Sequence, residues 1–378
     1  MSATVFVVNC GSSSLKYSLV DDDGSALASG TVETRAGHEA ALRGVLSSLA
    51  DTTVIAVAHR VVHGGERFSD PVVVDDEVLA AIRDLAPLAP LHNPVNALGI
   101  EIARRVLPDV PHVAVFDTAF HQTLPARAYT YAVPAEWGVR RYGFHGTSHA
   151  FVSRAAARLL GRPLADINVI VLHLGNGASA AAVEGGRSVD TSMGLTPLEG
   201  LVMGTRSGDV DPGVLLHLLR RGLSPQEVDE GLNERGGMLA LAGASDLREV
   251  HRRTDARAAL ALEVYCYRIR KYVGAYLAVL GRVDAIVFTA GVGEHDAAVR
   301  TRSLAGLEGL GIKIDPGRNL AASDEPRIIS PDGSAVAVLV VPTDEELEMA
   351  TQAATLVIGR APGTDARRPP AGRARARR

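Results

Sequence analysis

Three short segments rich in glycine, serine and other small residues have the composition of phosphate-binding loops. They are residues 9–14, which Lys16 follows, residues 173–179 and residues 289–295. Glycine lets backbone N–H groups approach an anion closely, and hydroxyls and a lysine add further donors. None is a Walker A loop, which requires GxxxxGK[ST] before a helix. Each alone could be an ordinary turn, but three together favour a phosphate or nucleotide site.

Arginine and histidine concentrate in residues 58–65, 140–149 and 204–212. A guanidinium between glycine and serine residues suits a phosphate clamp, because its planar fork donates two hydrogen bonds. With 36 arginines in the chain, a surface position is the simpler explanation for any isolated one. The pairs His59/His63 and His145/His149 have i, i+4 spacing. The glycines around both pairs argue against a helix there, no HExxH occurs, and we expect no zinc site.

Two carboxylates follow apolar runs. Asp117 ends the run 113–116, and Glu345 stands in residues 343–346, after the aliphatic run that begins at Ala335. Carboxylates at strand ends near phosphate loops can hold Mg²⁺ directly or through water. The alternatives stay open, because Asp117 could cap a loop and Glu345 could stabilise a helix N-terminus.

The elements that must position these side chains show an internal repeat. The run 5–12 continues into a second strand over 15–20, and the run 169–176 continues likewise over 178–183. Each pair predicts a β-hairpin with a small, polar tip. Farther along, residues 113–118 resemble residues 285–290, which makes Thr289 the expected counterpart of Asp117. Two matches in the same order indicate a duplicated domain.

Helical spacing of apolar residues lies between these strands. We expect helices over 75–85, 96–106, 214–219, 226–232 and 256–280, the second of them capped by Asn96 or Asn93. Strands that alternate with helices and hairpins predict α/β domains with mixed sheets. A cleft between two duplicated domains would then be the natural ligand site.

The composition excludes several classes of protein. Apolar residues make up 47% of the 378 residues and charged residues 22%, which is ordinary for a globular chain. Two cysteines, no signal-like N-terminus and no long apolar run predict a cytoplasmic protein without disulfides or membrane spans. Residues 362–378 hold six arginines and should be disordered. The net charge of −4 leaves the rest of the chain acidic, which argues against nucleic acid as a partner.

Four long motifs resemble the acetate kinase (acetokinase) family. They are residues 9–16, 59–65, 141–149 and 190–212. The resemblance implies the actin-like ATPase architecture: two duplicated ribonuclease H-like α/β domains, with mixed sheets flanked by helices and the active site in the cleft between them. It implies domains over 1–145 and 146–345, with a helix near 346–360 returning to the first. It also implies a reversible transfer of a phosphoryl group from ATP to acetate, which depends on Mg²⁺ or alternatively Mn²⁺. The family members are homodimers, so the resemblance implies a homodimer here.

The resemblance also implies roles for individual residues, carried over by motif. The expected catalytic residues are Asp117, His145, Arg206 and Arg60. The acetate pocket is formed by Arg60, Val62, Leu91, Phe144 and Pro197. ATP is bound by Lys16, His173, Leu174, Gly175, Asn176, Gly177, Asp246, Leu247, Arg248, Gly291, Val292, Gly293, Glu294 and His295. Mg²⁺ is bound by Asn9 and Glu345.

Two departures from the family pattern and two rival functions accompany this interpretation. His295 and Asp344 stand where the family usually has asparagine, so purine contacts and the charge near the metal could differ. A propionate or butyrate kinase is the rival within the family, although Val62 narrows the pocket and favours acetate. An actin- or chaperone-like switch ATPase is the rival outside it. Arg60, His145 and Arg206 disfavour that class, because a switch ATPase needs no carboxylate pocket.

Overall fold

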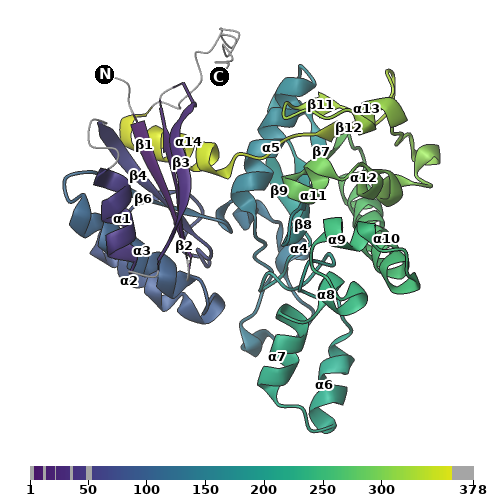
Figure 1. The fold of residues 1–378 in the computed structure, drawn as a ribbon, viewed down its shortest axis with the longest axis horizontal. Coiled ribbons are helices and arrows are strands. Elements are labelled where there is room, and N and C mark those ends of the chain that lie inside the picture. Colours follow the sequence, from purple (N-terminus) through teal and green to yellow (C-terminus); the bar gives the residue numbers. More distant parts are fainter. Residues whose placement is uncertain (1–3, 12–13, 22, 35–36, 48–52, 360–378) are drawn as a thin grey trace.

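Two six-stranded mixed sheets, each covered by helices on both faces, form the framework of the molecule (Figure 1). The computed structural model describes residues 4–11, 14–21, 23–34, 37–47 and 53–359. The expected disordered tail, 362–378, lies outside the described residues, as do Ser12 and Ser13 of the first hairpin tip. Both cysteines, Cys10 and Cys266, are free and buried, as expected of a chain without disulfides.

The first sheet has the strand order β3-β2-β1-β4-β6-β5. Strand β1 runs parallel to β4, and β4 parallel to β6, whereas the β1–β2, β2–β3 and β5–β6 pairs are antiparallel. The predicted hairpin of β1 and β2 is confirmed. The bounds are β1 Thr4–Cys10, β2 Ser14–Val20, β3 Ala26–Glu33, β4 Val54–Val61, β5 Val72–Val73 and β6 His112–Phe116.

The second sheet has the order β9-β8-β7-β10-β12-β11 and the same pattern of parallel and antiparallel pairs. The two sheets therefore share one topology, in which β7 and β8 correspond to β1 and β2, and the second predicted hairpin is confirmed. The bounds are β7 Asn168–Leu174, β8 Ala178–Glu184, β9 Arg187–Thr191, β10 Ala285–Thr289, β11 Arg327–Ile328 and β12 Ala337–Val340.

The shared topology corrects one of the two sequence matches. Strand β10 corresponds to β4, and β6 corresponds to β12, so the match of residues 113–118 with 285–290 paired the wrong strands. Thr289 is therefore not the counterpart of Asp117. Buried parallel strands are aliphatic along their whole length, so their composition does not distinguish neighbouring strands of one sheet.

Alternate residues of the central strands face different helices. Val5 and Val7 of β1 pack against α14, whereas Phe6 and Val8 pack against α1 and α3. Helix α14 comes from the end of the chain and lies on the first sheet (Figure 1). The division at residues 145 and 146 stays a prediction. The bounds are α1 His38–Ser47, α2 Asp76–Asp84, α3 Asn93–Val106 and α14 Glu345–Ile358.

The start of α3 differs from the prediction. Its N-cap is His92, without a side-chain cap, and both candidate capping residues lie inside the helix. The Asn96 amide accepts from the Val62 N–H (3.2 Å) and donates to the Cys10 carbonyl (3.1 Å). Asn93 makes the equivalent bonds to both backbone groups of His63. The two side chains therefore join α3 to the end of β4 instead of capping the helix.

The second sheet lies between α5 and α10. Val169 and Val171 of β7 face α5, and Ile170 and Leu172 face α10. The predicted helices over 214–219, 226–232 and 256–280 are confirmed by α6, α7 and α10. Among the described residues, no helix is long and apolar enough to cross a bilayer. The bounds are α4 Ala126–Tyr129, α5 Gly146–Leu159, α6 Pro212–Arg220, α7 Pro225–Asn233, α8 Gly237–Ala242, α9 Leu247–Arg252, α10 Ala256–Leu280, α11 Ala290–His295, α12 Ala297–Leu304 and α13 Pro316–Leu320.

Helix α5 contradicts the expectation that the glycines around His145 and His149 exclude a helix. It begins at Gly146 and runs through His149, with His145 as its N-cap. Glycine is required at 146 for a packing reason, because a β-carbon there would lie 2.3 Å from the Asp117 carbonyl oxygen. This close approach brings the start of α5 against the end of β6.

Candidate active site

A cavity of about 500 Å³ lies where the carboxyl ends of β1, β4 and β6 meet the start of α5. Such an edge is where open α/β sheets generally bind ligands. The cavity brings together all four predicted catalytic residues and all five predicted residues of the acetate pocket, of which Arg60 belongs to both sets. Its lining is Asn9, Cys10, Gly11, Arg60, Val62, Leu91, His92, Val95, Asn96, Asp117, Phe144, His145, Pro197 and Arg206.

Arg60 and Asp117 form a two-pronged ion pair on neighbouring strands. Arg60 Nε lies 3.0 Å and 3.1 Å from the two carboxylate oxygens of Asp117, and Nη2 lies 2.7 Å from Oδ2. The Asp117 side chain is 2% exposed and that of Arg60 is 25% exposed. The carboxylate raises the pKa of Arg60, whose charge is therefore permanent. Burial raises the pKa of Asp117, and the Arg60 charge opposes that shift.

This pairing leaves one edge of Arg60 available. Within the described part of the chain, its Nη1 has no hydrogen-bond partner. The side chain lines the cavity, so the unpaired N–H groups can meet an anionic ligand there. Asp117 thus holds the guanidinium in a fixed orientation.

His145 has an unusual backbone and a stacked ring. Its φ of 58° is in the left-handed region, a strained conformation for a residue with a β-carbon. The imidazole stacks on His173 with ring centroids 4.1 Å apart. Burial, then the nearby histidines and arginines, lower the pKa of His145 well below 6.5. The ring is therefore neutral near pH 7.

Arg206 approaches the same place from the loop after β9. Its Nη1 donates to the Pro197 carbonyl at 3.3 Å, and no carboxylate among the described residues pairs with it. A β-carbon on Gly177 would lie 3.5 Å from both Arg206 Nη1 and His145 Nε2. Side-chain nitrogens from two different elements therefore converge above a glycine.

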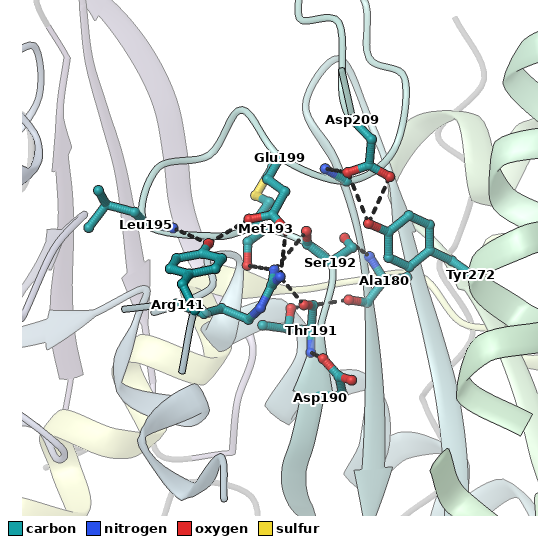
Figure 2. Close-up of polar contacts among 12 residues, drawn as sticks. Arg141, Ala180, Asp190, Thr191, Ser192, Met193, Leu195, Glu199, Asp209 and Tyr272 are labelled. Carbon is teal, nitrogen blue, oxygen red and sulfur yellow. Dashed lines mark hydrogen bonds and ion pairs between the residues drawn. The ribbon is translucent and has the colours of Figure 1, made fainter. Parts of the chain in front are cut away.

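A polar network holds residues 191–199, the segment that contains Pro197 and precedes Arg206 in the chain (Figure 2). The Arg141 guanidinium donates to the carbonyls of Thr191, Ser192 and Met193 at 2.9–3.1 Å and pairs with Glu199 at 2.5 Å. Tyr131 also donates to Glu199. These bonds fix the backbone between β9 and Pro197 without using a residue of the cavity itself.

Asn9 and Glu345 meet in an adjoining cavity of about 160 Å³, which Lys16 and Arg60 also line. Carboxylate and amide oxygens are the ligands that Mg²⁺ prefers, and the ion usually takes one or two carboxylates together with substrate phosphates. No group of three His, Cys, Asp or Glu able to hold a metal occurs among the described residues. The donor set thus fits an Mg²⁺ ion that completes its shell with phosphate and water.

Helices α5 and α14 both begin at this site. Thr147 of α5 donates to Glu345 of α14 at 3.4 Å, and Ser148 lies 2.8 Å from Thr343. Both helices have 14 residues, so each presents the positive end of a full helix dipole. Glu345 is the first residue of α14, as one alternative expected, and it also lines the cavity, so its role toward Mg²⁺ stays a prediction.

The three predicted ATP-binding stretches lie in the second half. Residues 173–177 form the β7–β8 tip, 246–248 open α9, and 291–295 form most of α11. A hydrogen bond of 2.6 Å between His251 and Asp296 ties α9 to the end of α11. None of the residues 246–248 or 291–295 lines either cavity described above. Leu174 and Leu247 are buried in the core, so only their backbones could contact a nucleotide.

Sequence reasoning missed several residues of the site. His92 lines the main cavity, but nothing in its sequence context marks it. Asn96 also lines it, although its place in the sequence predicts a helix cap. Arg300 is 1% exposed and donates to the carbonyls of Gly293 and Glu294 at 2.9 Å and 2.8 Å, beneath α11. A buried arginine among 36 carries no sequence signal.

Comparison with known proteins agrees with this geometry. A model of the acetokinase family matches residues 34–351. The acetate kinase of Streptomyces coelicolor is 55% identical, over 94% of this chain and 98% of that protein. The crystal structure of Porphyromonas gingivalis acetate kinase has a TM-score of 0.89 at 43% identity and covers 94% of this chain and 100% of its own. A propionate kinase from Francisella tularensis has a TM-score of 0.87 at 38% identity, over 93% and 98%.

These matches confirm the family and the two-sheet α/β fold that the sequence predicted. The family model spans well over half of the chain, and the curated relative aligns along nearly all of it. The chain belongs to the acetokinase family, whose members are phosphotransferases with a carboxyl group as acceptor.

Proposed function

We propose that this chain catalyses reversible, Mg²⁺-dependent phosphoryl transfer from ATP to acetate, which gives ADP and acetyl phosphate. The observation that carries the proposal is the convergence of Arg60, His145 and Arg206 on one cavity with an apolar wall. A switch ATPase has no use for such a carboxylate pocket, so this cavity and the family membership disfavour the actin- or chaperone-like alternative.

The chemistry requires little covalent work from the protein. A carboxylate oxygen of acetate attacks the γ-phosphorus of ATP while the bond to the β–γ bridging oxygen breaks, and that electron pair stays on ADP. Because acetate is already an anion, no proton has to be removed, and Asp117 serves to orient Arg60. Positioning and charge stabilisation therefore supply most of the rate.

Charge develops on the equatorial oxygens of the moving phosphoryl group. Arg60, held by Asp117, and Arg206, whose Nη1 donates to the Pro197 carbonyl, can face these oxygens from different elements. Neutral His145 adds a hydrogen-bond donor from the start of α5. The apolar side chains of Val62, Phe144 and Pro197 would enclose the methyl group of acetate.

Asn9 and Glu345 are the residues we assign to Mg²⁺, which when bound neutralises charge on the phosphates. Asp344 stands beside them where the family usually has asparagine. Its carboxylate accepts from the Leu347 N–H at 2.8 Å as the N-cap of α14, so part of its extra charge stabilises the helix.

For the nucleotide we propose a site along the β7–β8 tip, α9 and α11, with Lys16 reaching from the first sheet. His295 ends α11, next to the Asp296 that joins it to α9. A purine that docks there would therefore meet an imidazole in place of the usual amide.

A preference for propionate is the second candidate, and two observations support it. The side chain of Leu91, one wall of the pocket, is 75% exposed and so can move to admit a longer acid. A structural neighbour at 38% identity is a propionate kinase. Val62 and buried Phe144 favour acetate, because their side chains stand in the wall of the pocket and leave less room for a longer acid.

We also propose a homodimer formed by the second half of the chain. Helix α6 has no buried residue, and its Val214, Leu216 and Leu219 are 39–53% exposed. Apolar side chains gathered on one element indicate an interaction surface. Sedimentation of the purified protein at several concentrations tests this proposal, and a monomer at all of them contradicts it.

Hydroxylamine trapping of the acyl phosphate tests the reaction. The purified chain is incubated with ATP, Mg²⁺ and acetate, propionate or butyrate, and hydroxamate formation is measured against ADP release. We expect most turnover with acetate, and Arg206→Ala should lose nearly all of it while keeping its fold. ADP release without hydroxamate, or normal turnover of a folded Arg206→Ala variant, would contradict the proposal.

A further inference from the structure

Four histidines cluster where the start of α5 meets the β7–β8 hairpin. His121, His149 and His173 are buried, and His145 forms the rim toward the cavity. The β7–β8 register pairs His173 with Ser179, so both side chains lie on the face of the hairpin that α5 covers. The reaction proposed above gives only His145 a role at the phosphoryl group. His173 belongs to the proposed nucleotide-binding tip, and His121 and His149 are unexplained.

Ser179 connects two of these rings. Its hydroxyl lies 2.9 Å from Nδ1 of His145 and 2.8 Å from Nε2 of His149. Ser179 is fully buried in the second sheet. The three groups thus form an isolated chain, His149–Ser179–His145, that ends at the cavity.

The number of protons limits the directions in which these two hydrogen bonds can run. A hydroxyl has one proton to donate, and a neutral imidazole carries one N–H and one acceptor nitrogen. If both histidines donated to Ser179, its buried hydroxyl proton would have no acceptor among the described residues, which is costly. Two arrangements use that proton: either His149 donates to Ser179 and Ser179 donates to His145, or both bonds run the other way. In the first arrangement His145 carries its proton on Nε2, and in the second on Nδ1.

The second ring nitrogen of His149 distinguishes the two arrangements. Nδ1 of His149 is buried and has no hydrogen-bond partner among the described residues. If His149 donates from Nε2, this orphaned atom is an acceptor lone pair. If the bonds run the other way, it is an N–H without an acceptor, and orphaned buried N–H groups are the rarer and costlier kind. The bonds therefore run from His149 toward His145.

We infer that His149 and Ser179 are positioning residues that fix His145 as the neutral Nε2–H tautomer, with its N–H directed at the phosphoryl group. Nε2 lies at the point where Arg206 Nη1 converges, 3.5 Å from a β-carbon built on Gly177. Within the described chain it makes no hydrogen bond, so its proton is available to a ligand. The role toward phosphate rests on the proposed function, whereas the tautomer does not.

A second pair of bonds holds the ring that stacks on His145. His173 Nδ1 lies 2.8 Å from the Ser148 hydroxyl, which lies 2.8 Å from that of Thr343 beside the proposed Mg²⁺ ligand. The near-parallel stack, with 23° between the planes, fixes the plane of His145. Two imidazolium rings at 4.1 Å would repel, which favours neutral rings here. Burial lowers the pKa of His173 to about 4 in the same sense.

Histidine-selective ¹⁵N labelling of the full chain tests the inference without any assay of turnover. Two-bond ¹H–¹⁵N correlation spectra near neutral pH distinguish a protonated ring nitrogen from a bare one, and the signals of His145 are identified by their loss in His145→Gln. We expect Nε2 protonated and Nδ1 bare. A proton on Nδ1, or on both nitrogens, would overturn the inference.

Variants then test the relay. Ser179→Ala leaves a small side chain between Ala178 and Ala180, and we expect a mixture of His145 tautomers. Losing one transition-state donor typically costs about 10²–10³ in kcat, so partial loss should cost about tenfold, with KM values within about twofold. His149→Gln keeps a donor near the Nε2 position and should retain the Nε2–H tautomer, whereas His149→Ala should not.

The control is a similar pair elsewhere in the cluster. His121 Nδ1 lies 2.8 Å from the Ser188 hydroxyl. Among the described residues, Ser188 forms no hydrogen bond with His145 or Ser179. Ser188→Ala should leave the tautomer and the activity of the enzyme unchanged. An unchanged tautomer in Ser179→Ala would overturn the relay. An enzyme with the expected tautomer but no acyl phosphate would instead contradict the proposed function alone.

Discussion

Replacing Asp117 by asparagine separates its charge from its shape. The carboxylate accepts all three bonds that hold Arg60, and it is 2% exposed. Removing one partner of a buried pair typically costs about 3–5 kcal/mol. Arg60 is 25% exposed at the cavity, and the asparagine amide keeps one acceptor oxygen. Water and that oxygen should therefore offset part of the cost, and we expect the free energy of unfolding to fall by about 2 kcal/mol. That is a fall in Tm of about 4 °C.

The effect on catalysis should be larger than the effect on stability. An arginine facing the moving phosphoryl can contribute about 10³–10⁵ in rate, and a misoriented one should lose much of that. We therefore expect kcat to fall by at least about 10²-fold in the hydroxamate assay, with thermal unfolding measured in parallel. Asp76→Asn is the control, because Asp76 pairs with Arg104 at 2.8 Å but is 93% exposed. Near-normal kcat in a folded Asp117→Asn enzyme would refute the orienting role.

Three further predictions follow from the same contacts. Val62→Ala should raise kcat/KM for propionate relative to acetate by about tenfold, since one methylene is worth about 1–3 kcal/mol; an unchanged ratio would place the pocket elsewhere. Arg300→Met should raise KM for ATP more than KM for acetate, because Arg300 supports α11; equal changes would contradict that role. The pKa of buried His121 and of His173 is lowered to about 4, so unfolded chains bind more protons below pH 6.5. Folding stability should thus be full above pH 6.5 and fall by about 3 kcal/mol per histidine as pH drops to about 4, as denaturant titrations at each pH would measure; a flat profile would contradict the neutral cluster.

Much of the framework was predictable because local chemistry determines it. The β1–β2 and β7–β8 hairpins combine buried aliphatic runs with glycine-rich tips, and α10 has a long helical repeat, so both kinds of element match the prediction. Asp75, which caps α2 through the Val78 N–H at 2.7 Å, is equally local.

The predictions that were wrong, or that were not made, concern contacts between distant parts of the chain. Gly146 argues against a helix by propensity, but α5 needs a glycine there to pass the Asp117 carbonyl. Asn96 has the type of a capping residue, yet tertiary contacts with Val62 and Cys10 use its amide. The role of Ser179 follows only from the two histidines that folding brings to it.

The most direct test of the central claim is ³¹P NMR of the purified chain with ATP, Mg²⁺ and acetate. We predict that resonances of acetyl phosphate and ADP appear together in equal amounts, that omission of acetate abolishes both, and that acetyl phosphate with ADP regenerates ATP. Inorganic phosphate as the only new phosphorus product, formed equally with and without acetate, would contradict the account.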